Sequence, residues 1–530
     1  HFQGILCWLN AQGFAIEFRT LRILDRGSHG WAEFAAAQEC RTPEEVSRFY
    51  QRTGAYLALL YVMDATDLHA GNIIASGEHP VLVDLEALFH PHRSTRVDRP
   101  EASADRLADR FVRGSVLRIG LLPERLWGNS DHDGVDISGL GGAPGQLTPN
   151  AVAAWEDSGA DTMRFVRKRR AIRTEPNRPT LDGRPVDAIE YRDAVIRGFR
   201  SAYALLAASR EALLGPGGPL AVFARDPVSA FLRSSRTYRR LLHESYHPDV
   251  LRDALDRDRL FDLLWVEVQG DEDLMRVIRF ERDALWKGDI PCFTASPGSR
   301  HLRFGHGEIL ADFFPAPNLA TVQRIVDRMD EADCDHQAWF IEASLASAAG
   351  PLQHGPSYRV ALSTVSADPD RLLAAAVAVG NRLDQLAVRG ANDASWIGLD
   401  LERRRVWSVG RAGLDLDAGV PGIALFLAYL GAVTGHVAAS TLARAALATM
   451  RDSIVERESS LEGIGGFDGR GGVIYVLCHL GALWSRTDLV DQADELAARL
   501  PELISHDHAF DVFGGAAGCV LALRSLRRCR

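Results

Sequence analysis

The second half of the chain carries an internal repeat, and this repeat restricts the fold more than any other feature of the sequence. Two glycines three positions apart, followed by apolar residues at helical spacing, begin at Gly419, Gly469 and Gly515, in steps of 50 and 46 residues. A second helical stretch, residues 442–454, separates the first two copies. Paired helices repeated at this interval predict a helical solenoid or a closed α/α toroid. The glycines are expected to let a neighbouring helix pack closely against each helix start.

The first half is organised around residues 61–89, where two apolar runs, 72–75 and 81–83, predict short buried strands joined by a polar turn. Five polar residues bracket this hairpin: Asp67, His69, Asn72, Asp84 and Glu86. A hairpin brings its two ends together, and a cluster of carboxylate and amide oxygens suits Mg²⁺, which also takes phosphate oxygens. The pattern therefore predicts a phosphoryl-transfer site. The alternative, that these groups only cap strand and helix ends, is a weaker explanation for five of them around one hairpin.

The order of Asp67, Asn72 and Asp84 repeats the logic of a kinase catalytic loop. In protein kinases an aspartate accepts the substrate proton, an asparagine holds metal, and a second aspartate holds metal again. The spacing D-x-H-x-x-N followed by D-x-E is closer to the lipid-kinase form of this loop than to H-R-D. The sequence therefore predicts kinase-like chemistry at the hairpin.

A helix is expected to lead into the hairpin over residues 42–63, with Thr42 as its N-cap and Glu45 completing a capping box. Further helices are predicted over residues 191–214, 286–293 and 331–345. Residues 90–92, His-Pro-His, are expected to form an exposed turn and not a metal site, because a proline separates the imidazoles and a charged stretch follows.

Composition and charge exclude several classes of protein. The 530 residues are enough for two large domains, each with its own core. A net charge of -10 argues against a nucleic-acid partner, and the basic run 167–170 is either a solvated face or a contact for an acidic peptide segment. The seven cysteines form no regular pattern, which favours a reducing compartment, by default the cytoplasm. No apolar run reaches the roughly 18 residues of a membrane helix.

Only two lysines occur in the chain, Lys168 and Lys287, and both follow the hairpin. A kinase holds the nucleotide phosphates with a lysine from its small lobe. The chain also begins on a stretch, residues 1–10, that is typical of the interior of an amphipathic helix with no N-cap before it. We therefore expect the nucleotide-clamping lobe to lie outside this sequence.

Four motifs together resemble those of the class II lanthipeptide synthetases. Residues 28–34, Ser-His-Gly-Trp-Ala-Glu-Phe, are similar to the family's YGWxEF stretch. Residues 67–75 and 80–89 match its D-x-H-x-x-N-I-I-A and P-V-L-V-D-L-E-x-L-F motifs, and residues 287–291 match its G-D-I-P motif. The resemblance runs along almost the whole chain.

The resemblance implies an α+β, mostly α chain of two domains. A kinase-like, lipid-kinase-like dehydratase domain is expected at residues 1–369, and the first repeats of an incomplete α/α-toroid cyclase domain at residues 370–530. The boundary is placed near Pro369, because composition shifts toward alanine and leucine beyond it.

The resemblance also implies a lanthionine synthetase that modifies a ribosomal precursor peptide with a leader and a core. Mg-ATP would phosphorylate serine and threonine hydroxyls, and the same domain would eliminate the phosphate. A zinc cyclase would then add cysteine thiolates to the resulting alkenes. The implied cofactors are ATP, Mg²⁺ and, for the complete cyclase, Zn²⁺. Association with a membrane exporter is a further expectation, and the oligomeric state is left open.

The family's zinc ligands lie in later repeats than the three present here, so they are expected to be absent from this chain. Cys478-His479 superficially resembles a ligand pair, but its place in the middle of a repeat helix favours core packing. Residues 506–508, His-Asp-His, are more simply explained as a loop before Gly514 than as a metal site.

Each hairpin residue has an expected role in this scheme. Asp67 accepts or orients the substrate proton, and His69 organises the loop or contacts phosphate. Asn72 and Asp84 bind Mg²⁺, and Glu86 is a further carboxylate beside the metal.

Residues 228–238 correspond to the family's elimination stretch, V-R-x-x-x-R-x-T-x-x-Y. Here Ser229 stands where the first arginine is expected, and Ser235 replaces the threonine. A guanidinium stabilises departing phosphate through two hydrogen bonds, whereas a serine hydroxyl does so weakly. Arg233 or Arg236, expected within one or two helical turns, is the candidate replacement, and the alternative is that both are surface charges on a helix. If neither arginine stabilises the departing phosphate, the peptide is phosphorylated faster than the phosphate is eliminated.

Two other functions stay open. One is a peptide kinase that stops at the phosphopeptide, which Ser229 favours. The other is a non-enzyme: an inactive truncated remnant, or a scaffold that binds a leader peptide through its helical half.

Overall fold

The computed structural model describes residues 1–14, 16–27, 29–93, 103–126, 134–268, 271–305, 307–348, 368–402, 406–456, 461 and 463–530. The chain divides into two compact units, one from residues 1–95 and 115–349 and the other from residues 96–114 and 350–530. Helices predominate, and the strands form short antiparallel pairs and one four-stranded sheet, which confirms the α+β, mostly α class. Ser28, the first residue of the YGWxEF-like stretch, lies outside the described residues. Within the described part of the chain, no helix is both long and apolar enough to span a bilayer.

Two helices form the centre of the first unit. α2 (Pro43–Val62) and α4 (Arg192–Ala208) pack against each other. Glycine permits their close approach, since a Cβ at Gly54 would lie 1.9 Å from the Val195 carbonyl oxygen. Residues 52–62 of α2 are all buried, so the helix is held in place and its C-terminal end fixes where the hairpin segment begins.

The start of α2 follows the sequence prediction in part. Thr42 is the N-cap, and its side chain accepts a hydrogen bond from the Glu45 N–H (3.3 Å). The Glu45 carboxylate accepts from the Arg41 N–H (2.6 Å) and not from Thr42, so only half of the capping box forms.

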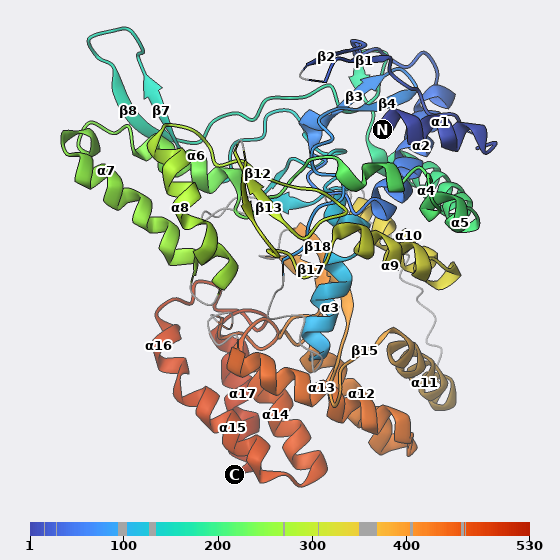
Figure 1. Cartoon of the computed structure of the whole chain (residues 1–530). Helices are drawn as coiled ribbons and strands as arrows, with labels where there is room; N and C mark the ends of the chain where they lie inside the picture. Colours follow the sequence, from blue (N-terminus) through green and yellow to red (C-terminus); the bar gives the residue numbers. More distant parts are fainter. Residues whose placement is uncertain are drawn as a thin grey trace. The chain divides into compact units, whose positions relative to one another are not determined.

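The first unit contains further helices and short strands. Its further helices are α1 (Phe2–Ala11), α5 (Arg210–Leu214), α6 (Ser235–Glu244), α7 (Ala254–Leu260), α8 (Glu272–Trp286), α9 (Asn318–Arg328) and α10 (Glu331–Ala348). Its paired strands are β1 (Ile23–Asp25) with β2 (Gly30–Ala32), β3 (Ile73–Ser76) with β4 (His79–Leu82), β5 (Arg125–Leu126) with β6 (Val135–Asp136), β7 (Val152–Glu156) with β8 (Arg164–Lys168), and β9 (Thr180–Leu181) with β10 (Arg184–Pro185). One four-stranded sheet has the order β11 (Val228–Ser229), β12 (Phe293–Ala295), β13 (Leu302–Phe304) and β14 (Glu308–Leu310). The connecting end of the β7–β8 hairpin projects from this unit (Figure 1).

The predicted helix over residues 331–345 is confirmed by α10. The one over residues 191–214 is confirmed in part, because a break at Ser209 divides it into α4 and α5. The one over residues 286–293 is wrong. α8 ends at Trp286, and Phe293 already belongs to β12. Between them Gly288 has a φ of 86°, a left-handed conformation that ends a helix and that glycine adopts without strain.

The second unit contains the repeat. Its elements are α3 (Ala104–Arg113), α11 (Pro369–Leu386), β15 (Val388–Arg389), β16 (Ala394–Ser395), β17 (Ile397–Glu402), β18 (Val406–Arg411), α12 (Val420–Thr434), α13 (Val437–Glu456), α14 (Arg470–Trp484), α15 (Thr487–Ala498), α16 (Leu500–Ile504) and α17 (Ala516–Cys529). The repeated segments form the neighbouring helices α12, α14 and α17, with α14 in contact with the other two (Figure 1). α13 packs on α12 and α15 on α14, which confirms the predicted helix pairs.

The glycines of the repeat have a different role from the one expected. The first glycine of each copy is the N-cap of its helix. A Cβ on the second glycine would meet the chain just before the helix, at 2.1 Å from Leu416 O for Gly422 and 2.0 Å from Val512 O for Gly518. The expectation that a neighbouring helix requires these glycines is therefore wrong, because the preceding loop of the same repeat is the closest neighbour.

α3 lies early in the sequence but belongs to the second unit. Its Asp105 accepts hydrogen bonds from the hydroxyls of Ser395 (2.7 Å) and Ser453 (2.7 Å) and forms an ion pair with Arg411. Arg411 also pairs with Asp109 of the same helix (Nε to Oδ1, 2.9 Å). The second unit is thus completed by a helix from far upstream, and the predicted domain boundary stays a prediction.

Candidate functional site

Asp64, a buried carboxylate just after the end of α2, fixes the position at which the site begins. Three side chains bind it: Arg118 (Nε, 3.0 Å), His92 (Nε2, 2.6 Å) and Asn318 (Nδ2, 2.9 Å). Burial acts to raise the pKa of Asp64, but these partners, Arg118 foremost, hold the pKa well below its usual range. His92 is exposed as predicted, but Pro91 is buried and His90 is half-buried, so the expectation of an exposed turn at residues 90–92 is confirmed only in part.

The backbone around the hairpin is left-handed at several residues that carry side chains. Asp64, Asp67, Asp84 and Phe89 have φ angles of 50°, 62°, 55° and 52°. Such conformations cost free energy and persist where surrounding contacts enforce them, commonly at functional sites. Backbone hydrogen bonds between the two ends of the segment, such as Phe89 N to Met63 O (2.9 Å), enforce them here.

His69 shapes the loop between Asp67 and the first strand. It is the N-cap of the 3-10 helix η1 (Ala70–Asn72), and its Nδ1 accepts a hydrogen bond from the Gly71 N–H (3.1 Å). In the neutral imidazole the proton then resides on Nε2. His69 therefore organises the loop and still keeps an N–H donor for an anionic ligand.

Asn72 joins the two ends of the hairpin. Its buried amide donates from Nδ2 to the Asp67 carbonyl oxygen (3.1 Å) and, more weakly, to the Asp84 carbonyl oxygen (3.5 Å). The antiparallel β3–β4 pair carries both aspartates to the same end of the hairpin. Because Nδ2 is used for the backbone, the acceptor Oδ1 of Asn72 is directed away from these carbonyls.

Asp67 lies in a negative environment. Its side chain reaches the surface, yet desolvation by neighbouring atoms raises its pKa, and the charges of Glu86 and Asp84 raise it further against the opposing effect of His69. A raised pKa makes Asp67 a better proton acceptor than an ordinary surface aspartate. Two further carboxylates within electrostatic reach of Asp67 also favour a bound cation.

Glu86 is held by Ser229 of β11. The Ser229 N–H donates to the Glu86 carbonyl oxygen (2.8 Å), and the Ser229 hydroxyl donates to Glu86 Oε2 (2.8 Å). The serine that stands in place of the expected arginine therefore reaches the hairpin as a neutral donor. Partial burial, followed by the charges of Glu86 and Asp289, raises the pKa of the Cys292 thiol, so the G-D-I-P turn lies within electrostatic range of the same site.

The two residues predicted for elimination have different surroundings. Ser235 is the exposed first residue of α6. Arg233 is buried, and its Nε donates to Glu281 Oε1 (2.8 Å), which also accepts from the Tyr238 hydroxyl (2.6 Å). The expectation of one continuous helix through this stretch is wrong, because β11 comes first and α6 begins only at Ser235. The catalytic roles of both residues stay predictions.

The oxygen donors at the hairpin fit a magnesium ion that arrives with a nucleotide. Within the described residues, no group of three or more histidine, cysteine, aspartate or glutamate side chains is arranged to hold a metal. Mg²⁺ needs only one or two protein carboxylates, because waters and phosphate oxygens complete its coordination. Asn72 Oδ1 and the exposed Asp84 carboxylate are oxygen donors of the type that Mg²⁺ takes, and their predicted role as its ligands stays a prediction.

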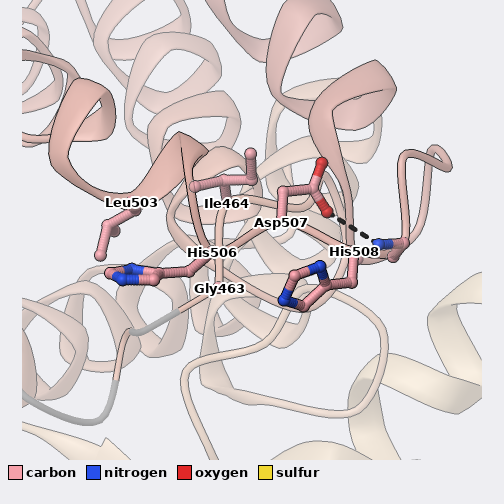
Figure 2. A pocket seen from close by; sticks show the side chains of 8 residues that line it. Gly463, Ile464, Leu503, His506, Asp507 and His508 are labelled. Atoms are coloured by element: carbon pink, nitrogen blue, oxygen red, sulfur yellow. Dashed lines mark hydrogen bonds between the residues drawn. The ribbon is translucent and has the colours of Figure 1, made fainter.

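In the second unit a hollow of about 250 Å³ lies beside residues 506–508 (Figure 2). His506, Asp507 and His508 all line this hollow (Figure 2). Asp507 accepts hydrogen bonds from the Ala516 N–H (2.8 Å) and the Ala509 N–H (3.0 Å). Desolvation opposes ionisation, but these backbone donors lower the pKa of Asp507 overall. The stretch is a loop organised by one carboxylate, as the sequence favours.

Cys478 and His479 lie in the middle of α14. Cys478 is fully buried, and burial raises the pKa of its thiol to about 12. The Nδ1 atom of His479 is hydrogen bonded to the Tyr429 hydroxyl of α12 (2.7 Å). Metal binding requires a thiolate, which this environment disfavours. Both side chains serve helix packing, as predicted.

Sequence reasoning missed the residues that support the hairpin. Asp64 and Asn318 are 254 positions apart, and Ser229 and Glu86 are 143 positions apart. No local pattern marks the first pair. The second had one signal, the departure from the family's arginine, but that signal did not identify Glu86 as the partner.

Comparison with known proteins identifies the class. Residues 1–296, which include the whole hairpin, match the family described as a domain of unknown function, DUF4135, and residues 411–528 match the lanthionine synthetase C-like proteins. The chain therefore belongs to the DUF4135 family, and its two regions in this order are those of the class II lanthipeptide synthetases. The resemblance seen in the motifs is confirmed.

A curated relative is the lacticin 481/lactococcin biosynthesis protein LcnDR2 of Lactococcus lactis subsp. lactis, 23% identical over 421 residues. The matched part covers 77% of this chain and 43% of the relative. The chain thus spans less than half the length of the curated relative it matches.

Proposed function

We propose that this chain carries the dehydratase and part of the cyclase of a lanthipeptide synthetase. The enzyme would use Mg-ATP to phosphorylate serine and threonine of a ribosomal precursor peptide, eliminate the phosphate and close thioether rings with cysteine. The observation that carries the proposal is the hairpin that gathers Asp67, Asn72 and Asp84 within a DUF4135 region. The relative's role in lacticin 481/lactococcin biosynthesis supports a peptide substrate. A kinase-like fold for the first unit and Zn²⁺ for the complete cyclase are parts of the proposal.

In this mechanism the hairpin residues orient and deprotonate the peptide hydroxyl. Asp67, with its raised pKa, accepts the proton of a serine or threonine hydroxyl. The Nε2–H of His69 donates to a phosphate oxygen, and Asn72 with Asp84 holds Mg²⁺. Bound Mg²⁺ supplies positive charge that offsets the charge of the phosphates.

Mass spectrometry of a co-expressed precursor peptide tests the proposal. With the complete reading frame that contains this chain, we expect the loss of one water for each modified serine or threonine. Asp84→Asn should abolish the loss. Asp182→Asn is the matched control, because Asp182 is also exposed and left-handed (φ 50°) but lies in the β9–β10 turn. A peptide of unchanged mass with the wild type would contradict the proposal.

A second candidate is a peptide kinase that stops at the phosphopeptide. The neutral Ser229 at the hairpin and the burial of Arg233 beside Glu281 favour it. Phosphate gain without water loss would identify this activity. Ser229→Arg is then expected to raise the fraction of dehydrated peptide, because a guanidinium stabilises departing phosphate.

A further inference from the structure

Ser229 joins the four-stranded sheet to the hairpin site. Its backbone N–H and its hydroxyl donate to the same residue, Glu86, over 2.8 Å each. This double attachment fixes both the backbone and the carboxylate of Glu86. An exposed glutamate without such a partner exchanges among rotamers, and ordering it costs free energy.

Ser229 is itself held by a strand with a buried face. It pairs with Thr294 of β12, and the next residue, Ala230, donates its N–H to the Phe293 carbonyl oxygen (2.9 Å). Phe293 is buried, and β12 pairs in turn with β13. The sheet therefore helps to set the position of Glu86, in addition to the hairpin.

A serine at this place orients Glu86 without neutralising it. A guanidinium would cancel the charge of the carboxylate it binds, whereas a hydroxyl leaves that charge in place. Asp84 and Glu86 each lie within electrostatic reach of Asp67, so the site keeps three carboxylates. The combined negative charge of these carboxylates favours a divalent cation. The effect of that charge on the reaction depends on the orientation of each carboxylate group.

We propose that Ser229 is a positioning residue, whose hydroxyl and backbone N–H hold Glu86 in place at the phosphoryl-transfer site. This role differs from the expulsion of phosphate expected of an arginine at the same place. The inference rests on the proposed function and adds one residue to that site.

Two substitutions separate the hydroxyl from the backbone contact. Ser229→Ala removes the hydroxyl and keeps the backbone hydrogen bond, and Ser229→Thr keeps both. In the complete protein we expect Ser229→Ala to lower kcat for peptide phosphorylation about tenfold at unchanged peptide KM, because a misplaced carboxylate weakens only the chemical step. Ser229→Thr should stay near wild type. Ser296→Ala is the matched control, since Ser296 lies beside β12 and its described hydrogen bond uses only its carbonyl oxygen.

A double-mutant cycle shows whether Ser229 acts through Glu86. In a Glu86→Ala background, Ser229→Ala should have no further effect on kcat. An additive loss, or an unchanged kcat in Ser229→Ala alone, overturns the proposal.

A second measurement does not depend on activity. The Glu86 charge helps to raise the pKa of the exposed Cys292 thiol, so the pH dependence of Cys292 alkylation, followed by mass spectrometry of its peptide, reports the position of Glu86. We expect the profile to move to lower pH in Ser229→Ala and in Glu86→Ala, and to stay in place in Ser229→Thr. An unmoved profile in Ser229→Ala overturns the proposal. A wild type that phosphorylates no peptide while its variants show this shift supports the positioning role and refutes the proposed function alone.

Discussion

The hairpin of the first unit and the repeat helices of the second both place strict local requirements on single residues, but the requirements differ in kind. In the hairpin, Asp64, Asp67 and Asp84 hold left-handed conformations. At the helix starts of the second unit, glycine occupies the crowded positions, as at Gly422 and Gly518. In the hairpin the side chains are present in spite of the strained backbone, whereas at the helix starts a side chain is absent because there is no space for a Cβ. Substitutions should therefore affect activity in the hairpin and stability at the helix starts.

The largest effect is expected from Asp84→Asn, which removes a charge and keeps a residue that tolerates positive φ. Folding should be unchanged, while phosphorylation should fall on the order of 10³-fold, because the proposed metal ligand loses its charge. Single-turnover phosphopeptide formation measures the rate, and thermal unfolding measures the stability. Asp182→Asn should change neither. If Asp84→Asn instead lowered stability and left the phosphorylation rate unchanged, Asp84 would have a structural role like that of the repeat glycines.

Arg233→Ala tests whether the first unit also depends on packing close to its site. Arg233 and Glu281 form an ion pair with side chains 1% and 0% exposed. Removing one partner leaves a buried charge, so we expect the free energy of unfolding to fall by about 3–5 kcal/mol. The double variant Arg233→Met with Glu281→Leu should recover most of this loss in denaturant unfolding.

The same double variant addresses the predicted elimination role of Arg233. If it folds but accumulates phosphopeptide, Arg233 also serves elimination. If the single variant Arg233→Ala is as stable as wild type, the structural role is wrong.

Gly518→Ala tests the helix starts. The added Cβ would lie 2.0 Å from the Val512 carbonyl oxygen, so the loop before α17 has to shift. We expect a loss of about 1–3 kcal/mol in the stability of the second unit, as overpacking produces. Gly398→Ala, where no heavy atom lies within 4 Å, is the control in thermal unfolding. Equal stabilities of the two variants would contradict the role assigned to the repeat glycines.

The smallest effect is expected from pH. Desolvation and the charges of Glu86 and Asp84 raise the pKa of Asp67. Asp67 must be deprotonated to accept a proton, so phosphorylation should fall as pH decreases through this raised pKa, at a higher pH than the ordinary aspartate value of about 3.9. Its contribution to stability has the opposite sign, since the protonated form favoured by the fold is lost as pH rises. Glu86→Gln should move the acid limb of the rate profile to lower pH, and an unmoved limb would remove Glu86 from the electrostatics of Asp67.

The parts of the molecule that the sequence predicted have local signals. The hairpin combines two apolar runs, a turn and five polar residues within residues 61–89, and each signal refers to near neighbours. The repeat was predictable for a related reason, because the same helical pattern occurs three times in the sequence. The pattern showed that small residues were needed at Gly422 and Gly518, but it did not show which part of the chain approaches them.

The supports of the site were not predictable, because they join distant segments. Asp64 binds Arg118 and Asn318, and Glu86 binds Ser229, through folding that brings separate elements together. Neither the amino-acid composition nor the periodicity of apolar residues shows which distant residues will contact each other. The end of α8 was missed for another reason. The left-handed backbone of Gly288 ends the helix, although the sequence pattern favours its continuation.

Helix α3 limits how a gene of this kind can be rearranged. The DUF4135 match, residues 1–296, contains this helix, yet its Asp105 and Asp109 hold Arg411 of the second unit. Recombination that exchanged only the second half would set a foreign surface against the original helix. Leaving a nearly buried guanidinium without its carboxylates would cost about 3–5 kcal/mol. The two halves are therefore expected to be inherited together, and Asp105 and Arg411 to change in concert among descendants of one ancestor.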